Sequence, residues 1–419
     1  MSFILFHILF DIIVDNSKWI FRLNRTIFIK CKTNMQDKLK FTIEATKGKA
    51  RAGIMELNWQ IVQTPTFMPV GTKATIKWLI LDMLKDSKYI WDLPVINLIL
   101  ANTYHLFLRP WNELIKDFGG IHKFENRDGL ILTDSWWFQI FSLWLSKNQK
   151  QNHWNTLQIK WKNKSFFKIL KEWVKFRNIH DGTRHFRTPM DCVDVQCDIW
   201  SDIMMMLDVC SPPWISDKKV KEQLRLTHHR AKQQYERHQS KYDEVRWVLW
   251  PIVQWWTNLD LRTESASILS KYSPDGIAIG WVSVGESTEQ VQRVVSHTTP
   301  LLPENKPRYL MWVWDPEWIK FAIEQGIDLF DCVLPTRLWR HGMYYTDDWY
   351  QKITASKNKH DFSKLTDNCD CFACRNFSKA YFHHLFREKE MLWATLLSLH
   401  NIVYLHRMVV GIRKNIVGK

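Results

Sequence analysis

Hydrophobic positions follow a repeating pattern from residue 95 onward, in which short apolar runs alternate with longer amphipathic stretches. Helical periodicity predicts helices over 218–239, 260–271, 286–297 and 316–325. The apolar runs predict buried parallel strands over 97–101, 130–133, 202–207, 248–253, 276–279, 309–313 and 329–334. Strand followed by helix, repeated many times, predicts an α/β protein, and a (β/α)8 barrel fits the number and length of the repeats. A doubly wound sheet is the alternative, although the sequence contains no G-x-G-x-x-G or Walker motif.

Polar side chains stand at the carboxyl ends of several predicted strands. Asp134 and Asp331 each follow an apolar run, and in a barrel such positions face one mouth, where catalytic groups lie. Chemistry at an anomeric carbon uses one carboxylate as nucleophile and a second group for proton transfer, so both aspartates are candidate catalytic residues. The alternative is that each only caps the helix that follows it. Ser135, Asp208 and Gln254 are similarly placed, and the last two could hydrogen-bond a polar ligand such as a purine.

The charge balance favours a polyanionic partner. The chain has 58 Lys and Arg against 43 Asp and Glu, a formal net charge of +15, which is typical of proteins that bind nucleic acid. Arg337 and Arg340 follow Asp331 closely and could contact phosphates or base edges, or form no more than a solvated basic loop. The basic tail over 375–419 could add phosphate contacts or be a soluble helix face. No apolar run reaches about 18 residues, so a membrane-spanning helix is not expected.

Three of the eight cysteines lie within six residues, in Cys369-Asp-Cys-Phe-Ala-Cys374. Cys369, Cys371 and Cys374 with His400 would make a closed tetrahedral Zn²⁺ set, which indicates a structural metal. His383 and His384 compete with His400 for the fourth position, and three surface thiols without a metal are the alternative. The other cysteines are scattered, which is unlike a small secreted protein and favours the reducing cytoplasm.

The chain ends and one internal stretch interrupt this pattern. The apolar stretch over 3–14 has no basic start and no small-residue cleavage site, so it is a poor match to a signal peptide. We expect residues 1–34 to be an extension and Met35 to be the functional start, with a membrane-surface segment or a disordered arm as alternatives. The expected domains are a catalytic barrel over 35–360 and a zinc-binding subdomain with closing helices over 361–419. The stretch 147–171, rich in Lys, Gln and Asn, is expected to be an exposed insertion.

Several motifs share a single family resemblance. They are Thr64-Pro-Thr-Phe-Met-Pro-Val-Gly71, Leu100-Ala-Asn-Thr-Tyr-His-Leu106, Leu132-Thr-Asp-Ser-Trp-Trp-Phe-Gln139, Ser201-Asp-Ile-Met-Met205, Ile252-Val-Gln254, Ser283-Val-Gly-Glu286, Pro307-Arg-Tyr-Leu-Met311, Phe330-Asp-Cys-Val-Leu-Pro-Thr-Arg337, the cysteine cluster, Tyr381-Phe-His-His-Leu-Phe386 and Leu399-His-Asn401. In this order, over about residues 39–407, the sequence closely resembles the tRNA-guanine transglycosylases of the queuosine pathway. The resemblance implies a TIM barrel with a zinc-bearing subdomain, and exchange of the wobble guanine of tRNA for a 7-deazaguanine.

The resemblance also implies a role for each candidate residue. Asp331 matches the nucleophile that attacks the ribose C1′ and holds the tRNA covalently, and Asp134 matches the residue that takes a proton from the incoming base. The remaining matches are groups that contact the base (Ser135, Asp208, Gln254, Met311 and the backbone at Trp281), groups that grip nucleotides around the target (Arg337, Arg340) and the zinc set (Cys369, Cys371, Cys374, His400).

Substrate and partner follow from the same resemblance. Cys210 and Val284 resemble the bacterial type, which accepts the small precursor preQ1 rather than queuine. Val209 departs from the usual Glu, which puts fine base selectivity in doubt. The implied partners are tRNAs with GUN anticodons (Asp, Asn, His and Tyr types), guanine or preQ1, and a second copy of the chain in a homodimer.

Tryptophan and glycine are present in abnormal numbers. The chain has 24 Trp and only 14 Gly, whereas about 7% Gly would give roughly 29, a shortfall of about 15. Trp stands where the resembling family has Gly at 78, 111, 136, 137, 173, 200, 255, 256, 281, 312, 314 and 339, and also at 59, 349 and 393. We hypothesise that a gene in which UGA means glycine has been translated with UGA as tryptophan. Trp247, in contrast, is expected to be genuine.

Two other functions stay open at this point. A non-catalytic tRNA-binding relative or subunit would keep the fold without the chemistry; the presence of both Asp134 and Asp331 argues against it, but genuine tryptophans in the base pocket would favour it. An archaeal-type enzyme that modifies the tRNA body is disfavoured by Cys210 and Val284.

Overall fold

The computed structural model describes residues 38–136, 173–209, 217–241, 247–280, 286–313 and 315–418, with short strands at 14–15, 18–19 and 167–169. The chain divides into two units, Met1–Asp37 and Lys38–Lys419. In the first, β1 (Val14–Asp15) pairs antiparallel with β2 (Lys18–Trp19). Several predictions concern residues that lie outside the described ranges. They are the start at Met35, most of the insertion over 147–171, and Cys210, Trp281 and Val284.

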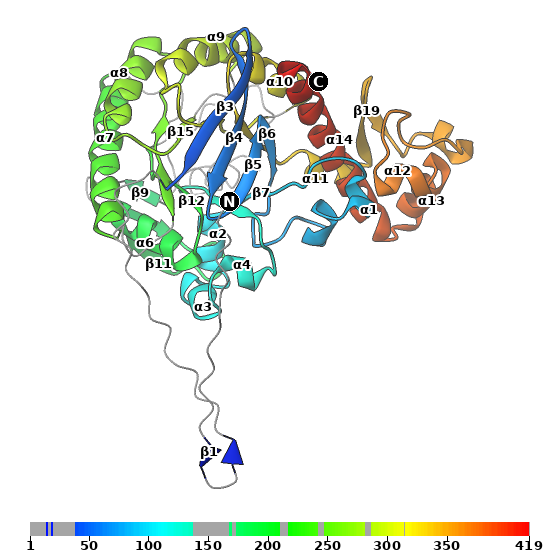
Figure 1. The fold of residues 1–419 in the computed structure, drawn as a ribbon, viewed down its shortest axis with the longest axis horizontal. Coiled ribbons are helices and arrows are strands. Elements are labelled where there is room, and N and C mark those ends of the chain that lie inside the picture. The colour runs from blue at the N-terminus through cyan, green and yellow to red at the C-terminus, as the bar shows by residue number, and fades with distance from the viewer. Residues whose placement is uncertain are drawn as a thin grey trace. The chain divides into compact units, whose positions relative to one another are not determined.

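The second unit is built around a closed parallel barrel (Figure 1). In order around it come β6 (Thr66–Pro69), β7 (Leu98–Ala101), β8 (Leu130–Thr133), β12 (Ile203–Met205), β13 (Val248–Trp250) continued past Pro251 as β14 (Ile252–Val253), β15 (Ile277–Ile279), β16 (Arg308–Leu310) and β17 (Leu329–Cys332). Strand β17 pairs with β6, and a parallel bridge between Val70 and Leu100 joins β6 to β7, so the sheet has no open edge. The predicted (β/α)8 barrel is confirmed, and the doubly wound alternative is wrong.

Alternation along the strands fills the barrel. Every second strand residue belongs to one interior cluster that includes Leu98, Leu100, Leu130, Leu132 and Leu329, because successive side chains of a strand point to opposite faces. The intervening residues, such as Ile99 and Ile131, pack outward under the helices. The two faces are both apolar, which explains why these strands read as continuous apolar runs in the sequence.

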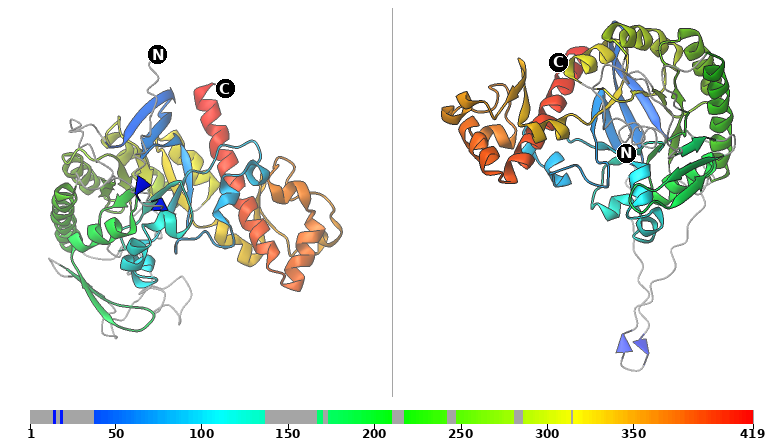
Figure 2. Two further views of the ribbon diagram at one scale, coloured as in Figure 1. Left: turned by 60° about the horizontal axis from the view of Figure 1, so that its bottom comes forward. Right: turned by 180° about the vertical axis from the view of Figure 1, so that it is seen from behind.

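Helices surround the barrel on the outside (Figure 2). The long ones are α6 (Pro189–Ile199), α7 (Asp217–Ser240), α8 (Leu259–Ser270), α9 (Thr288–Thr298) and α10 (Pro316–Glu324). Shorter ones are η1 (Leu81–Leu84), α1 (Ser87–Ile90), α2 (Thr103–Leu108), α3 (Asn112–Asp117), α4 (Ile121–Phe124) and η2 (Thr299–Leu301). Polar caps fix several starts: Thr188 and Ser287 form capping boxes at α6 and α9, and Asn258 caps α8.

Three additions complete the unit. The first is an antiparallel sheet that the hydrophobic pattern did not predict, made by β3 (Lys40–Lys47), β4 (Ala50–Leu57) and β5 (Gln60–Thr64). It contributes Met55, Leu57 and Val62 to the interior cluster, which also includes Leu39 just before β3. The C-terminal part contains α11 (Pro335–Leu338), η3 (Trp339–His341), β18 (Met343–Thr346), β19 (Trp349–Lys352), η4 (Ser356–His360), α12 (Phe372–Asn376), α13 (Lys379–Glu388) and the long α14 (Leu392–Val417) (Figure 1). A further sheet is made by β9 (Phe167–Ile169), β10 (Val174–Arg177) and β11 (Arg184–Arg187). In the described part of the chain, no helix is long and apolar enough to cross a membrane.

Ten tryptophans adopt a backbone conformation that favours glycine. Their φ angles lie between 49° and 113°, at Trp59, Trp78, Trp91, Trp111, Trp136, Trp200, Trp255, Trp256, Trp312 and Trp349. At nine of these ten positions the resembling family has glycine, and Trp91 is a tenth position that the resemblance did not indicate. The left-handed region costs an L-residue roughly 1–2 kcal/mol, so ten cost roughly 10–20 kcal/mol, against roughly 5–15 kcal/mol for the whole stability of a domain. The fold is therefore poorly compatible with tryptophan at these positions.

Candidate active site

Asp331 lies at the end of β17 and points into the barrel mouth. It is two residues beyond the interior residue Leu329 and therefore on the same face of the strand. Its Oδ1 accepts hydrogen bonds from the Tyr309 hydroxyl at 2.7 Å and the Trp312 backbone N–H at 2.8 Å. Burial raises the pKa of Asp331, and these two donors oppose that rise. Asp331 does not cap the following helix α11, whose N-cap is Leu334.

Asp134 follows β8 on the inward face, after Leu130 and Leu132. Its Oδ2 accepts from the Asn102 side-chain amide at 2.6 Å, and its Oδ1 from the Thr103 backbone N–H at 3.1 Å. The Thr103 hydroxyl donates to the Asp134 carbonyl at 2.6 Å. Because Asn102 is the N-cap of α2, the carboxylate is fixed to the first turn of a helix that precedes it in the chain.

A cavity of about 190 Å³ brings the two carboxylates together. Besides Asp134 and Asp331 it is lined by Asn102, His105 and Arg337, with apolar walls from Val70, Leu100, Trp312, Val313 and Val333. Burial, helped by the positive charge of Lys73, lowers the pKa of His105 to about 4, so this imidazole is neutral at pH 7. One small cavity thus holds two carboxylates, a neutral imidazole and a guanidinium.

Of the predicted base-contacting residues, Ser135, Asp208 and Gln254 are buried and Met311 is partly buried, and none of these four lines the cavity. The Ser135 hydroxyl donates to Asp208 at 3.2 Å, and the Gln254 amide donates to the Thr227 hydroxyl at 3.2 Å. The same hydroxyl accepts the backbone N–H of Val209 at 3.1 Å, which ties the loops after β12 and β14 to helix α7. Met311, just after β16, packs against the interior cluster.

Indole rings occupy space beside these residues. Trp136, directly after Ser135, is 2% exposed and stacks on Phe107 with ring centroids 5.0 Å apart. Trp255, directly after Gln254, packs against Leu224 and Leu261. The buried indole N–H groups of Trp136, Trp255 and Trp256 have no hydrogen-bond partner in the described structure. The same is true of Trp250, which lies in regular strand backbone, so the missing partner alone does not set these three apart from other tryptophans.

Positive charge gathers at the mouth of the cavity. Burial and the neighbouring Arg340 lower the pKa of Arg337, and burial followed by Arg340, Arg337 and Lys73 lowers that of Lys77. These four cations repel one another, and no described acidic side chain forms a salt bridge with any of them. Such a cluster can bind an anion, as phosphate contacts require.

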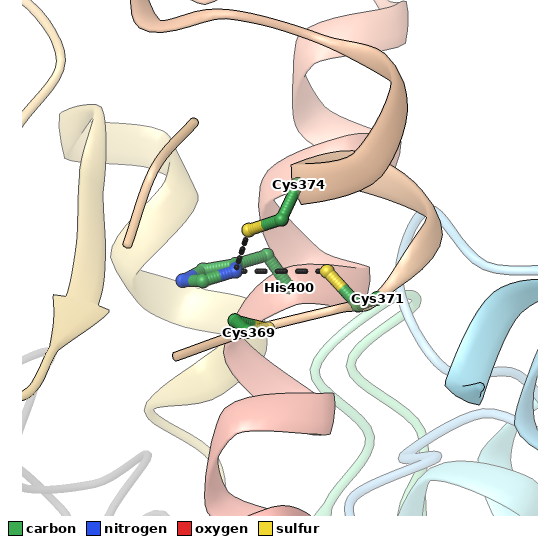
Figure 3. Close-up of side chains that lie close together, drawn as sticks. All are labelled: Cys369, Cys371, Cys374 and His400. Carbon is green, nitrogen blue, oxygen red and sulfur yellow. Dashed lines mark hydrogen bonds between the residues drawn. The ribbon is translucent and has the colours of Figure 1, made fainter. Parts of the chain in front are cut away.

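A candidate metal centre lies in the C-terminal part (Figure 3). The ligand atoms of Cys369, Cys371, Cys374 and His400 lie within 4.8 Å of one another, and all four residues are buried. Sγ of Cys374 and of Cys371 lie 3.3 and 3.7 Å from Nδ1 of His400. With Zn–S near 2.3 Å and Zn–N near 2.0 Å, tetrahedral ligands lie roughly 3.5–3.8 Å apart, so the set fits a metal ion.

Neighbouring groups settle which histidine joins the three cysteines. Nε2 of His400 donates to the Tyr345 carbonyl at 2.9 Å, which leaves Nδ1 free to bind a metal. Nδ1 of His383 lies instead 2.9 Å from the Ile353 carbonyl. Of the three candidates, His400 alone belongs to the described cluster, and His383 and His384 do not.

Comparison with known proteins identifies the family that the sequence motifs resemble. The family model for queuine tRNA-ribosyltransferase matches residues 46–419. The queuine tRNA-ribosyltransferase of Caldanaerobacter subterraneus subsp. tengcongensis is 40% identical over 368 residues, 88% of this chain and 90% of that protein. Those of Nitrosomonas eutropha and Thermodesulfovibrio yellowstonii are 40% and 39% identical, over 90% and 91% of this chain and 96% and 92% of their own lengths. The chain belongs to this family.

Sequence reasoning missed three residues of the family member's candidate site. Tyr309 supports Asp331, Asn102 supports Asp134, and His105 lines the cavity. Asn102 and His105 stand in a motif that the resemblance had already singled out, so their position was available from sequence. Tyr309 also stands in such a motif, Pro307–Met311, but nothing in the sequence indicated its contact with Asp331, because a tyrosine inside a predicted strand is an ordinary core residue.

Proposed function

We propose that this chain exchanges the guanine at wobble position 34 of tRNAs with GUN anticodons for preQ1, in the biosynthesis of queuosine. Family membership makes it a tRNA-guanine transglycosylase, and therefore a pentosyltransferase. The observation that supports this most directly is the pair of buried carboxylates, Asp134 and Asp331, which line one cavity together with Arg337. Glycosyl transfer with retention needs this combination of a nucleophile and a second group for proton transfer.

In the proposed first step, Asp331 attacks C1′ of the target ribose. A bond forms between a carboxylate oxygen and C1′, the C1′–N9 bond breaks, and the electron pair leaves with guanine. Both donors to Asp331 end on Oδ1, so we assign the attack to Oδ2. The apolar surroundings that raise the pKa of Asp331 also remove water from the carboxylate, which makes it a better nucleophile.

In the proposed second step, Asp134 acts as the base. It takes the N9 proton of the incoming preQ1, whose N9 then attacks C1′ and displaces Asp331, so that two inversions give net retention. Asp134 releases this proton to water, which balances the proton that the departed guanine takes up at N9. Asn102 and the backbone N–H of Thr103 hold the carboxylate in place while its charge changes.

Base and tRNA contacts complete the proposal. Ser135, Asp208 and Gln254 would hydrogen-bond the edge of the base, with Met311 against its face and the backbone at residue 281 alongside. Arg337 and Arg340 would hold the phosphates or bases next to position 34, and Lys73 and Lys77 extend the same positive surface. The formal net charge of +15 supports a tRNA partner.

We further propose that the metal is one structural zinc ion, that two chains form a homodimer, and that the enzyme works in the cytoplasm. Three cysteines and one histidine are a set that zinc prefers, and a closed four-ligand site leaves no position for substrate. Outside this cluster, Cys192 and Cys197 are free and buried, which suits a reducing compartment.

The test is exchange of labelled guanine into unmodified tRNA with a GUN anticodon, followed by displacement of the label with preQ1. Two versions of the protein are compared: the chain as written, and one with glycine at the ten tryptophan positions of positive φ and at the other six positions where the resembling family has glycine (137, 173, 281, 314, 339 and 393). We expect exchange in the glycine version, none in the same version carrying Asp331→Asn, and little in the chain as written. A glycine version that folds, contains metal and binds tRNA but exchanges no guanine would overturn the proposal in favour of a non-catalytic tRNA-binding relative.

A further inference from the structure

We infer that residues 59, 78, 91, 111, 136, 200, 255, 256, 312 and 349 are glycine in the protein that its own cell makes, because that cell reads the codon UGA as glycine. The tryptophan and glycine counts raised this hypothesis, and the backbone now selects the positions independently of any relative. It does not depend on the proposed function, since it concerns how the gene is translated.

The hairpin between β4 and β5 gives the clearest case. Leu57 pairs with Gln60, so Asn58 and Trp59 alone form the loop, with φ angles of 47° and 66°. Two central residues with positive φ make a type I′ turn, for which Asn-Gly is the preferred sequence. Trp59 is 95% exposed, so no packing of its ring compensates for the conformation. The turn is therefore an Asn-Gly turn with the wrong second residue.

The C-terminal end of α6 is a second place where the backbone conformation favours glycine. Trp200 has φ 64° and ψ 45°, a left-handed conformation, and its N–H bonds back to the carbonyl groups of Cys197 and Gln196. A residue that ends a helix in this conformation is usually glycine. Residue 200 is therefore a glycine position for a reason unrelated to the first.

At the active site, a residue with positive φ contacts the carboxylate of Asp331 through its backbone. Trp312 has φ 63°, and this conformation brings its N–H to Oδ1 of Asp331. Trp136, Trp255 and Trp256 also have positive φ. Glycine at 312 would keep the backbone hydrogen bond to Asp331. Glycine at 136, 255 and 256 would remove three indole rings next to Ser135 and Gln254.

Other tryptophans show that the pattern is selective. Trp250 lies within β13 and Trp318 within α10, in regular backbone, and Trp247 is likewise absent from the positive-φ residues. A single reassigned codon accounts for this split: UGG encodes the genuine tryptophans, and UGA encodes glycine, including the ten positions of positive φ. The partner this requires is a glycine-charged tRNA whose anticodon pairs with UGA.

One tryptic peptide tests the inference with an internal control. Trypsin releases residues 247–262, which contain Trp247 and Trp250 as controls and positions 255 and 256 as the test. In protein purified from the source cell, mass spectrometry should find tryptophan at 247 and 250 and glycine at 255 and 256. The gene should carry UGG at the first two codons and UGA at the other two, and UGA also at the remaining eight positions.

Each other outcome contradicts the inference. Tryptophan at 255 and 256 would overturn it, as would UGG codons at most of the ten positions. Glycine at all four positions of the peptide would overturn the use of backbone conformation to separate the two groups. None of these readouts uses enzyme activity, so failure of the proposed function and failure of this inference are distinguishable.

Discussion

The hydroxyl of Tyr309, inside the barrel on β16, lies 2.7 Å from Oδ1 of Asp331 at the end of the neighbouring strand β17. Tyr309 is fully buried, and burial beside the carboxylate raises its pKa, so the hydroxyl keeps its proton and donates it in this hydrogen bond. The side chain that fills the barrel interior thus also orients the proposed nucleophile. In a parallel barrel this coupling is direct, because the layer of residues below the mouth touches the catalytic layer above it.

Removing this hydroxyl should slow the first chemical step. A hydrogen bond to a charged group contributes about 1.5–3 kcal/mol, so we expect Tyr309→Phe in the glycine version to lower kcat by roughly 10- to 100-fold. Without the donor, the pKa of Asp331 rises further, so the acid limb of the pH–rate profile should move to higher pH. Tyr104→Phe is the control, since that buried hydroxyl has no partner in the described structure. An unchanged profile in Tyr309→Phe would contradict a positioning role.

Asp331→Asn should separate activity from stability. The variant loses the proposed nucleophile, so we expect no covalent enzyme–tRNA adduct on denaturing gels and no guanine exchange. The folded state raises the pKa of Asp331, so the buried carboxylate destabilises the fold at neutral pH, and the neutral amide removes that cost. The melting temperature at pH 7.5 should therefore be equal to or higher than that of the parent protein. A clear fall in melting temperature would show that the charge stabilises the site.

The metal cluster should be required for stability but not for chemistry. Cys371→Ser removes one of four ligands, so we expect loss of bound zinc, measured by elemental analysis, and a melting temperature lower by several degrees. Cys197→Ser, at a buried free cysteine outside the cluster, should keep the metal. Full zinc content in Cys371→Ser would rule out the four-ligand set.

Trp200→Gly and Trp318→Gly should have opposite effects on stability. In a protein with glycine at the other nine positions of positive φ, Trp200→Gly relieves a left-handed tryptophan and should raise the free energy of unfolding by roughly 1–2 kcal/mol. Trp318→Gly, within α10, should lower it by roughly 0.5 kcal/mol from helix propensity alone, since Trp is an intermediate helix former, and by more through lost packing. Urea denaturation measures both. Two changes of the same sign would contradict the assignment of residue 200 as a glycine position.

Glu125 should make stability depend on pH. Burial raises the pKa of this carboxyl to about 7, and neither of its oxygens has a hydrogen-bond partner in the described structure. The folded pKa lies above the ordinary value of 4.5, so the folded state holds the proton more tightly, and stability falls as pH rises from about 4.5 to about 7. Glu125→Gln should therefore raise the melting temperature at pH 8 and have little effect at pH 4.5. An equal gain at both pH values would show that the effect is not electrostatic.

The sequence by itself determined the barrel and its chemistry to a large extent. Both faces of a parallel strand are buried, so each strand is a continuous apolar run, and the polar residue that ends it, such as Asp134 or Asp331, marks the barrel mouth. The cysteine cluster could equally be recognised from the sequence, because its three thiols lie close together in the chain. These signals are local, and short stretches of sequence carry them completely.

Tertiary structure decided what depends on distant parts of the chain. It chose His400 over His383 and His384, because only the fold brings a residue of α14 to the cysteines. It revealed Tyr309 as the partner of Asp331 and Asn102 as the partner of Asp134, contacts between strands that sequence spacing does not encode. It also supplied the φ angles at Trp59, Trp200 and the other eight positions, since the backbone at a turn or helix end is fixed by the elements on either side. The sequence lists the residue at each position, but the assembled fold sets the backbone conformation that the position requires.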